Sequence, residues 1–406
     1  MIIGIPKETC PGECRVGMVP QNVVALTKQG RTIIVESGAG ILAGHADAAY
    51  TSAGAEIVNR KDIFDRADIV VQVQTPGLNL DTGADDLASL KAGQIVIGMM
   101  DPLANPEFAQ QLADKKITGV AMELIPRITR AQSMDVLSSN AMISGYKAVL
   151  IGASNLGSML PMNMTAAGTL KPARVLIMGV GVAGLQACAT AKRLGGVVEA
   201  YDVRPAAREQ ILSVGAKPVE LNIEAEDTET QGGYAKEQSA DFIARQQAAM
   251  TDVLSQQDIV ITTAAVPGKK SPILITADMV KGMKPGAVIV DLACEKGGNC
   301  ELTKLDEIVV ENGVKIVGPK NIPSTVATHA SQMYGKNIEN LLSHLIGEEG
   351  QLHFDYEDEI VRETVVSLNG EVPQARLRDL LGLAALPTPD ITEEAEESAD
   401  TSADKA

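Results

Sequence analysis

The stretch VLIMGVGVAG, residues 175–184, decides the fold that we expect for this chain. An apolar run suited to a buried strand enters a glycine turn, and a helical pattern, LQACATAKRLGG, follows directly. Gly179 allows the sharp turn, Gly181 lets a pyrophosphate touch the backbone, and Gly184 lets helix and strand pack closely. The free N–H groups at the helix N-terminus favour the phosphates. The predicted phosphate-binding turn consists of Gly179, Val180, Gly181, Val182, Ala183 and Gly184.

An acidic residue stands where a dinucleotide-binding unit needs one. A second mostly apolar run, Val197–Tyr201, ends at Asp202, and Val203 and Arg204 follow. A carboxylate at the end of the second strand accepts hydrogen bonds from a ribose diol and repels a 2′-phosphate, which favours NAD(H) over NADP(H). Arg204 is the opposing signal, because a guanidinium there can accommodate that phosphate. The alternative for the whole motif is a glycine turn with a purely structural role.

The charge balance excludes several classes of partner. The 406 residues carry a formal net charge of −17, which argues against nucleic acids and anionic membrane surfaces because phosphate-rich partners need a basic footprint. The acidic last twenty residues, 387–406, have too little apolar surface to fold, and we expect a disordered tail.

The sequence shows no sign of export or of a bound metal. The N-terminus lacks a basic region followed by a long apolar segment, so we expect a cytoplasmic protein. The 5 cysteines are scattered without zinc spacing, which predicts reduced thiols and no metal site. The apolar window Ala141–Leu170 contains Lys147, Asn155 and Pro161, so we interpret it as a buried or subunit-facing helix instead of a membrane span.

Short apolar runs alternate with amphipathic stretches along most of the chain, which is typical of βαβ units. We therefore expect an α/β protein with two Rossmann-like domains, each with a mostly parallel, doubly wound sheet, separated by a cleft. The predicted domains are a discontinuous N-terminal domain (1–137 plus 322–386), a nucleotide-binding Rossmann domain (138–321) and the acidic tail (387–406). A helical pattern after Pro323 is expected to return to the first domain.

Two further segments carry specific expectations. Met134–Met164 is rich in small residues and predicts a long helical passage between the domains. Asn222–Asp241 is long, acidic and interrupted by Gly232 and Gly233, which predicts a mobile lid carrying Tyr234. A loose insertion without a role is the alternative for this second segment.

Several motifs resemble the alanine dehydrogenase and nicotinamide nucleotide transhydrogenase family. They are Ile5-Pro6-Lys7-Glu8 with Arg15-Val16, GVGVAGLQA, AYDVRP at 200–205, AVPGKKSPILIT and MKPGAVIVDLACEKGGNCE. The likeness extends from residue 1 to about 380 and is more specific than any single motif.

The two branches of that family differ in their chemistry. Oxidation of an amino acid needs a cation near the substrate and a group that moves a proton. The resemblance places Gln74 at the family's substrate lysine, Met100 at its histidine and Glu295 at the dehydrogenase aspartate. Gln74 and Met100 cannot act as acids or bases, and Arg15 alone binds a carboxylate without transferring a proton.

The loop RITRAQSMD, residues 127–135, resembles the segment by which transhydrogenases place a nicotinamide. The resemblance implies that Arg127, Gln132, Asp135 and Ser138 surround that end of the cofactor, the first three as catalytic residues. If a helix begins near Arg130, Gln132 and Asp135 share one face and Arg127 pairs with Asp135. Ordinary surface roles are the alternative. The remaining predicted cofactor contacts are Tyr234, Ala264 and Ala265.

The resemblance therefore implies the NAD(H)-binding subunit of a proton-translocating transhydrogenase. NADH bound here would pass hydride directly to NADP⁺ on a partner subunit, and a further partner would span the inner membrane, where this chain would be peripherally associated on the cytoplasmic side. A homodimer is expected, with contacts through the surface of Ala141–Met164. The alternatives are an alanine dehydrogenase-like amino-acid dehydrogenase and a non-catalytic NAD(H)-binding regulatory module.

Overall fold

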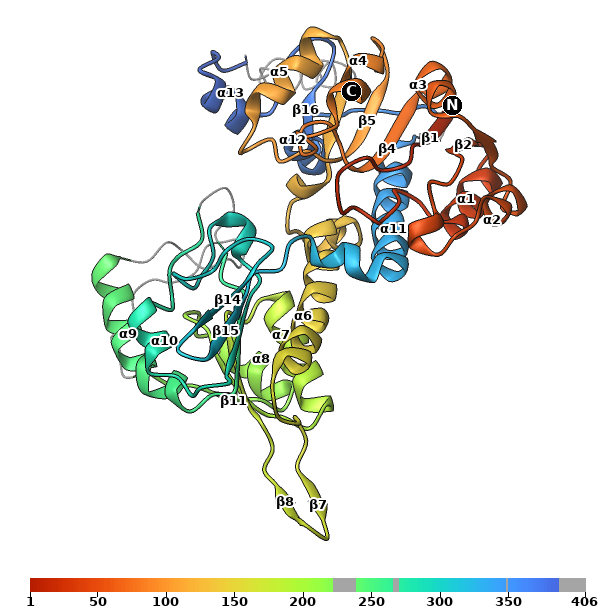
Figure 1. Ribbon diagram of the computed structural model, residues 1–406. Helices are drawn as coiled ribbons and strands as arrows, with labels where there is room; N and C mark the ends of the chain where they lie inside the picture. Colours follow the sequence, from red (N-terminus) through yellow and green to blue (C-terminus); the bar gives the residue numbers. More distant parts are fainter. Residues whose placement is uncertain (222–238, 266–269, 348–349, 387–406) are drawn as a thin grey trace, which may run out of the picture.

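The computed structural model describes residues 1–221, 239–265, 270–347 and 350–386. Within these residues the strands form two seven-stranded sheets and one two-stranded ribbon. Figure 1 shows the two large sheets in separate bodies, joined by α6 (Val136–Asn155) and by the segment that leads into α11 (Ala327–Leu345). The predicted α/β class with two mostly parallel sheets is confirmed.

The first sheet has the order β16-β6-β5-β4-β1-β2-β3 and is parallel except for β16, which runs antiparallel to β6. Alternate residues of β2 enter different buried clusters, Ile33 and Val35 one and Ile34 the other, so this sheet is buried on both faces. The strands are β1 (Ile2–Ile5), β2 (Thr32–Glu36), β3 (Glu56–Val58), β4 (Ile69–Gln74), β5 (Ile95–Met99), β6 (Thr118–Ala121) and β16 (Val365–Ser367).

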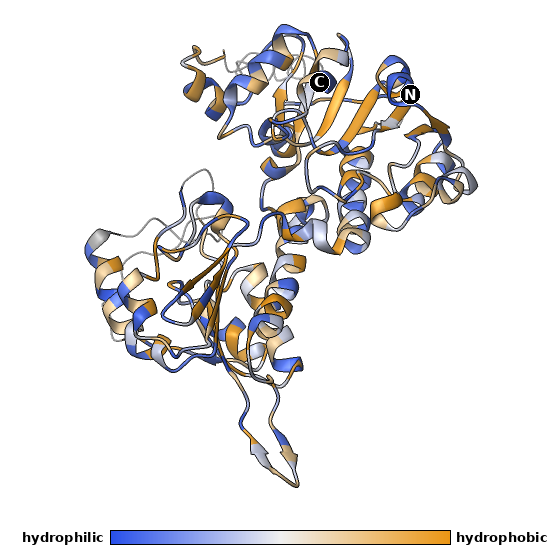
Figure 2. Ribbon diagram, viewed as in Figure 1, coloured by the Kyte–Doolittle hydropathy of each residue, from blue (hydrophilic) through white to orange (hydrophobic). Residues whose placement is uncertain are grey.

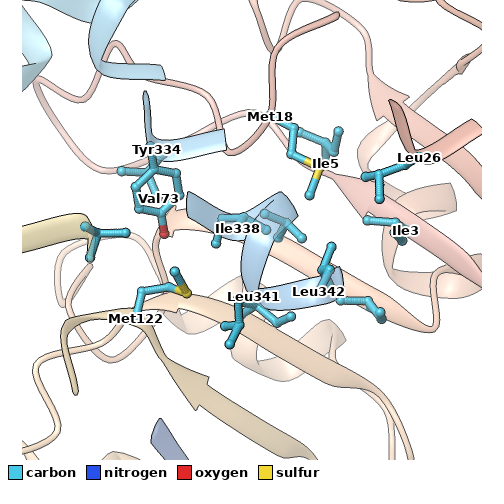
Figure 3. Close-up of a cluster of buried hydrophobic side chains, with 14 of the residues drawn as sticks. Ile3, Ile5, Met18, Leu26, Val73, Met122, Tyr334, Ile338, Leu341 and Leu342 are labelled. Atoms are coloured by element: carbon cyan, nitrogen blue, oxygen red, sulfur yellow. The ribbon is translucent and has the colours of Figure 1, made fainter. Parts of the chain in front are cut away.

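The helix α11 returns to the first sheet from the far end of the chain. Its residues Tyr334, Ile338 and Leu342 lie in one buried cluster with Ile3 of β1 (Figure 3). The Tyr334 hydroxyl donates to the carbonyl of Gln72 at 2.8 Å, which satisfies a polar group inside the cluster. Other helices of this body are α1 (Pro20–Lys28), α2 (Asp47–Ser52), α3 (Arg60–Arg66), α4 (Ala84–Ser89), α5 (Pro106–Asp114), α12 (Glu359–Thr364) and α13 (Ala375–Leu381), with the 3₁₀ turns η1 (Ile41–Ala43), η2 (Met122–Leu124), η3 (Thr129–Met134) and η5 (Ile322–Val326).

The second sheet has the order β11-β10-β9-β12-β13-β15-β14 and is parallel except for β14. The chain starts at β9 in its middle, builds outward on one side and then crosses to β12, so the switch point lies between β9 and β12. Figure 2 shows apolar residues concentrated in the strands of both sheets. The strands are β9 (Arg174–Met178), β10 (Val197–Tyr201), β11 (Lys217–Pro218), β12 (Ile259–Thr262), β13 (Val288–Asp291), β14 (Ile308–Glu311) and β15 (Val314–Val317).

Helices α6 and α7 (Val182–Arg193) pack with their backbones in contact. A Cβ atom added at Gly145 of α6 would lie 2.0 Å from the carbonyl oxygen of Ala183, so only glycine fits there. Small residues in the passage between the bodies thus serve this close approach. The other helices of the second body are α8 (Ala207–Ser213), α9 (Ala240–Ser255), α10 (Ala277–Lys281) and the 3₁₀ turn η4 (Cys294–Lys296).

The helix predicted across Met134–Met164 is too long. It begins at Val136, ends at Asn155, and is followed by the hairpin β7 (Asn163–Thr165) and β8 (Gly168–Leu170), so the window Ala141–Leu170 is not one helix. Leu156 is already extended, and Pro161 further on lacks the N–H that a continuing helix requires. Figure 1 shows the hairpin projecting away from the second body.

The predicted domain boundaries coincide with structural landmarks. The boundary at 137/138 falls within the first turn of α6, and the boundary at 321/322 falls at the start of η5. The division of the chain into these domains stays a prediction. The acidic tail lies outside the described residues, as does most of the predicted lid, including Tyr234.

Candidate nucleotide-binding site

The glycine turn connects β9 to α7 as the sequence predicts, and its three glycines have three different surroundings. Gly179 has φ +93°, which residues with a side chain rarely adopt. A Cβ at Gly184 would lie 2.0 Å from the carbonyl oxygen of Gly179, whereas a Cβ at Gly181 would have no heavy atom within 4 Å. The turn is therefore closed behind Gly184 and open at Gly181, next to the exposed Val182 and the first turn of α7. This geometry fits a pyrophosphate against the backbone.

Asp202 follows β10 and is already engaged. Its carboxylate accepts hydrogen bonds from the N–H of Val180 at 2.7 Å and from the N–H of Arg204 at 2.8 Å. The guanidinium of Arg204 folds back onto the same carboxylate, with Nε 2.9 Å from Oδ1 and Nη2 2.9 Å from Oδ2. The Asp202 side chain is only 6% exposed. The two opposing sequence signals thus form one ion pair that also holds the glycine turn.

A pocket of about 260 Å³ lies beside this ion pair. It brings together the predicted contacts Asp202, Val203 and Arg204. Ile211 and Phe242 contribute apolar surface to its walls. A pocket with an apolar lining and one charged corner suits a flat heterocycle attached to a polar sugar.

The carboxyl end of β12 completes the turn on the other side. The hydroxyl of Thr263 donates to the carbonyl oxygen of Gly179 at 2.8 Å. Ala264 follows and is held by the side chain of Asn299, while Ala265 is exposed. The predicted contacts Ala264 and Ala265 therefore lie next to the glycine turn. Sequence reasoning missed Asn299, although it belongs to the quoted GGNC run.

The residues predicted around the nicotinamide lie where the first body meets α6. Asp135 is the N-cap of α6, and its carboxylate accepts hydrogen bonds from the N–H and the hydroxyl of Ser138, at 2.9 and 2.6 Å. Gln132 is exposed in η3, and Arg127 is exposed just before it. The chain thus brings Asp135 and Ser138 into direct contact and places the other two close by in sequence.

The predicted arrangement of this loop is wrong in two respects. Asp135 has an extended backbone and η3 ends at Met134, so Gln132 and Asp135 do not share one helical face. The expected ion pair between Arg127 and Asp135 is absent from the ion pairs of the described residues. Capping explains this, because the Asp135 carboxylate bonds the first turn of α6 instead.

A buried ionic cluster lies at the junction between the two bodies. Arg15 donates to both oxygens of Glu13, at 2.7 and 2.6 Å, and also to Asn140 of α6 and Asn321 before η5, each at 3.3 Å. Burial opposes the charge on Glu13, but the bonds and charge of Arg15 prevail and lower its pKa to about 2. Gln74 donates to Glu13 at 2.6 Å. One arginine therefore touches both segments that connect the bodies.

Two more carboxyl groups sit at the same edge of the first sheet, and sequence reasoning assigned neither. Burial, followed by the charge of Glu13, raises the pKa of Glu8 to about 8, although Glu8 accepts the N–H groups of Val73 and Gln74. Burial also raises the pKa of Glu123 to about 7, and one of its oxygens accepts the N–H of Met100 at 2.7 Å. Both carboxyls thus bond the backbone at strand ends.

Polar contacts also join the two bodies near this cluster. Lys296 of η4 forms a salt bridge at 2.6 Å with Asp101, the residue after Met100. Glu295 accepts the N–H of Asn321 at 2.8 Å. Within the described residues no group of three or more histidine, cysteine, aspartate or glutamate side chains is arranged to hold a metal ion.

Two family models match the chain. The model described as alanine dehydrogenase/PNT, N-terminal domain, matches residues 4–144, and alanine dehydrogenase/PNT, C-terminal domain, matches residues 148–375. The chain belongs to the alanine dehydrogenase/PNT family.

Relatives from both branches of the family resemble the chain over nearly its whole length. An NAD(P) transhydrogenase subunit alpha chain of Rhodospirillum rubrum is 49% identical over 375 residues, 92% of this chain and 97% of that protein. The crystal structure of transhydrogenase from Sinorhizobium meliloti has a TM-score of 0.81 and 41% identity, covering 92% of this chain and 100% of that one. A solved L-alanine dehydrogenase has a TM-score of 0.77 and 25% identity, covering 94% and 99%.

Within this family, the junction bears on which branch the chain follows. Met100 is fully buried, and the amide of Gln74 is bonded to Glu13. Arg15 is 3% exposed and directs its guanidinium at Glu13, Asn140 and Asn321. The arginine that would bind the carboxylate of an amino acid is therefore already occupied by side chains of the protein.

Proposed function

We propose that this chain is the NAD(H)-binding subunit of a proton-translocating NAD(P) transhydrogenase. In this proposal hydride passes directly between NADH held here and NADP⁺ on a partner subunit. The observation that carries it is a contrast between two sites. The glycine turn and the pocket at Asp202 fit a dinucleotide, whereas the junction offers a bonded amide at Gln74 and a buried thioether at Met100.

Direct hydride transfer suits such a site. NADH supplies the hydride when it is bound, and no proton joins or leaves either nicotinamide ring, so a general acid or base is unnecessary. Catalysis then consists of positioning, with the two ring carbons held at roughly 3–3.5 Å and water excluded. The protein's own contribution is a rigid cradle.

The roles of the residues follow the geometry. Gly179, Gly181 and Gly184 would accommodate the pyrophosphate, and Asp202 would accept the adenosine ribose. Arg127, Gln132, Asp135 and Ser138 would orient the nicotinamide end, with Ala264 and Ala265 along the opposite side. Tyr234, outside the described residues, would close over the bound nucleotide.

The partners proposed are an NADP(H)-binding subunit and a membrane-spanning subunit. The words "subunit alpha" in the name of the Rhodospirillum rubrum relative support a multisubunit complex. None of the helices in the described residues combines the length and the hydrophobicity needed to cross a bilayer. In this proposal the chain lies at the cytoplasmic face of the inner membrane and is held there by its partners.

We also propose a homodimer, and the hairpin β7–β8 supports it better than the predicted surface of α6 does. Met162, Met164 and Leu170 on or beside this hairpin are 61%, 73% and 50% exposed. Large apolar side chains on a projecting hairpin are typical of a surface that a second subunit covers.

One mixing experiment tests the proposed function. The chain loaded with NADH is mixed with the NADP⁺-loaded partner subunit, and oxidation of NADH is followed in a single turnover. Rapid transfer is expected, and no transfer would leave a regulatory NAD(H)-binding module. A parallel assay with L-alanine and NAD⁺ should give no turnover. Turnover on the order of 1–10³ per second would instead establish an amino-acid dehydrogenase.

A further inference from the structure

The side chain of Asn299 holds both polar backbone groups of Ala264. Its Oδ1 accepts the N–H of Ala264 at 3.0 Å, and its Nδ2 donates to the Ala264 carbonyl at 2.8 Å. The same Nδ2 donates its second hydrogen to the carbonyl of Pro272 at 2.8 Å. Asn299 is fully buried, so this amide has no water to replace these bonds.

The amide is held in place by its own backbone. The N–H of Asn299 donates to Oδ2 of Asp291 at 2.8 Å, and its carbonyl accepts the N–H groups of Leu274 and Ile275 at 2.8 and 3.0 Å. Asp291 is fully buried at the end of β13 and also accepts the hydroxyl of Thr303 at 2.7 Å. The strand end at Asp291 therefore fixes Asn299, and Asn299 fixes Ala264.

Ala264 lies at the switch point of the second sheet. It follows β12, which neighbours β9, and the preceding Thr263 bonds the carbonyl of Gly179 in the glycine turn. The adenosine side of the sheet is occupied by Asp202 at the end of β10, on the other side of β9. A dinucleotide that crosses the switch point places its second half over β12. Ala264 thus borders the nicotinamide half.

We propose that Asn299 is a positioning residue for hydride transfer, which fixes the Ala264 backbone against the nicotinamide half of the nucleotide. This inference rests on the proposed function. Asn299 touches no reacting atom. Its amide clamps the loop after β12 so that the ring stops at one depth, and a displacement near 1 Å can cost on the order of 10²-fold in rate.

The chemistry of the clamp requires an amide. Ala264 presents one donor and one acceptor, and only asparagine or glutamine offers the complementary pair on one planar group. A carboxylate of the same shape still accepts the Ala264 N–H but directs an oxygen at the carbonyls of Ala264 and Pro272, which repels them. Asn299→Asp therefore breaks the clamp without changing its volume.

The test compares Asn299→Asp with Thr303→Val in the full chain. Thr303→Val removes a bond to the same Asp291 carboxylate but leaves the amide and Ala264 untouched. We expect Asn299→Asp to slow single-turnover hydride transfer to the NADP⁺-loaded partner at least tenfold at saturating NADH and to change the fluorescence of bound NADH. Binding of ADP, which lacks the nicotinamide half, should stay within twofold. Thr303→Val should transfer hydride at the wild-type rate.

Equal transfer rates in the two variants, or a parallel loss of NADH and ADP binding in Asn299→Asp, would overturn the inference and leave Asn299 a stabilising residue. Hydrogen exchange of the wild-type chain gives an independent test if Asn299→Asp does not fold. The Ala264 amide should be protected without nucleotide, and rapid exchange there would exclude the clamp. Failure of the wild-type chain itself to transfer hydride would contradict the proposed function and is therefore distinguishable.

Discussion

At the scale of single residues, Asp202 and Arg204 show how the structure changes the meaning of a sequence signal. Read separately, one favours NAD(H) and the other accommodates NADP(H). Joined at 2.9 Å, they form an ion pair in which the carboxylate largely neutralises the guanidinium. Preference for NAD(H) then depends on the pair remaining intact.

The first prediction concerns this pair. In Asp202→Ala the ribose loses its acceptor, and we expect the affinity for NADH to fall about tenfold, the loss of roughly one charged hydrogen bond. NADPH should bind more tightly than to the wild type because Arg204 is released toward the 2′-phosphate. Calorimetry with both nucleotides measures the two changes. Equal affinities of the wild-type chain for NADH and NADPH would contradict the assignment.

The second prediction concerns Gln132. It is exposed in η3, and η3 is anchored from behind, since Asn337 and Asn340 donate to the carbonyl of Ser133 at 2.8 and 2.9 Å. Gln132→Asn shortens the amide by one methylene on this fixed support. We expect nearly normal NADH binding but hydride transfer slowed on the order of 10²-fold. Ser133→Ala keeps the anchoring carbonyl and is the matched control. An unchanged rate in Gln132→Asn would make it an ordinary surface residue.

At the scale of elements, apolar runs predicted the strands well where the strands are fully buried. The runs at Thr32–Glu36, Ile95–Met99 and Val197–Tyr201 coincide with β2, β5 and β10. Such strands are legible because burial on both faces leaves no place for polar residues. The class of the fold followed from them.

The elements that sequence reasoning missed are short or lie at edges. β3 and β16 have three residues each, too few for a periodic pattern. β14 is an edge strand, but the turn into β15 contains Asn312-Gly313, both with positive φ, which is a hairpin signal that could have revealed it. The contacts of Asn299 and Glu13 could not be predicted, because they join segments far apart in sequence.

The third prediction concerns the loop that follows β1. Glu13, with its lowered pKa, stabilises the fold above about pH 4.5, and this contribution is lost as the pH falls towards 2. Glu8 has the opposite sign. Its pKa is about 8 in the folded chain, so its contribution is complete below about pH 4.5 and is lost as the pH rises through 8.

Glu8→Gln keeps the neutral form at every pH. We therefore expect the variant to gain on the order of 3 kcal/mol relative to the wild type between pH 5 and pH 8. Denaturant unfolding across this range measures the difference. Glu107→Gln, at an exposed carboxylate of α5, is the control and should show no such trend. A difference between Glu8→Gln and wild type that does not vary with pH would contradict a buried, protonated Glu8.

At the scale of the whole molecule, the two bodies meet through polar contacts. Arg15 bonds a residue on each connecting segment, and Lys296 bridges to Asp101 from the facing loop. Interfaces of this polar kind between domains permit relative movement. Hydride transfer to a partner requires the nicotinamide to remain accessible, and an interface without a large apolar core is compatible with that.

The fourth prediction concerns assembly. Met164 and Asn163 are neighbours on β7 with side chains on opposite faces. Met164→Asp places a charge on the apolar face, so we expect the dissociation constant of the dimer to rise at least tenfold, while Asn163→Asp adds the same charge elsewhere and should change it little. Sedimentation at several concentrations measures both. A wild-type chain that is monomeric at micromolar concentration would exclude the homodimer.

The contact between Gly145 and Ala183 gives α6 the character of a ruler. Asp135 caps the helix at one end, and ten residues later Gly145 rests on the turn that begins α7. An α-helix rises 1.5 Å per residue, so these two points are about 15 Å apart along a rigid rod. Adding or removing one residue between them would rotate one end by about 100° relative to the other. The length of this segment is therefore fixed, whereas the hairpin beyond Asn155 can change length without altering the spacing.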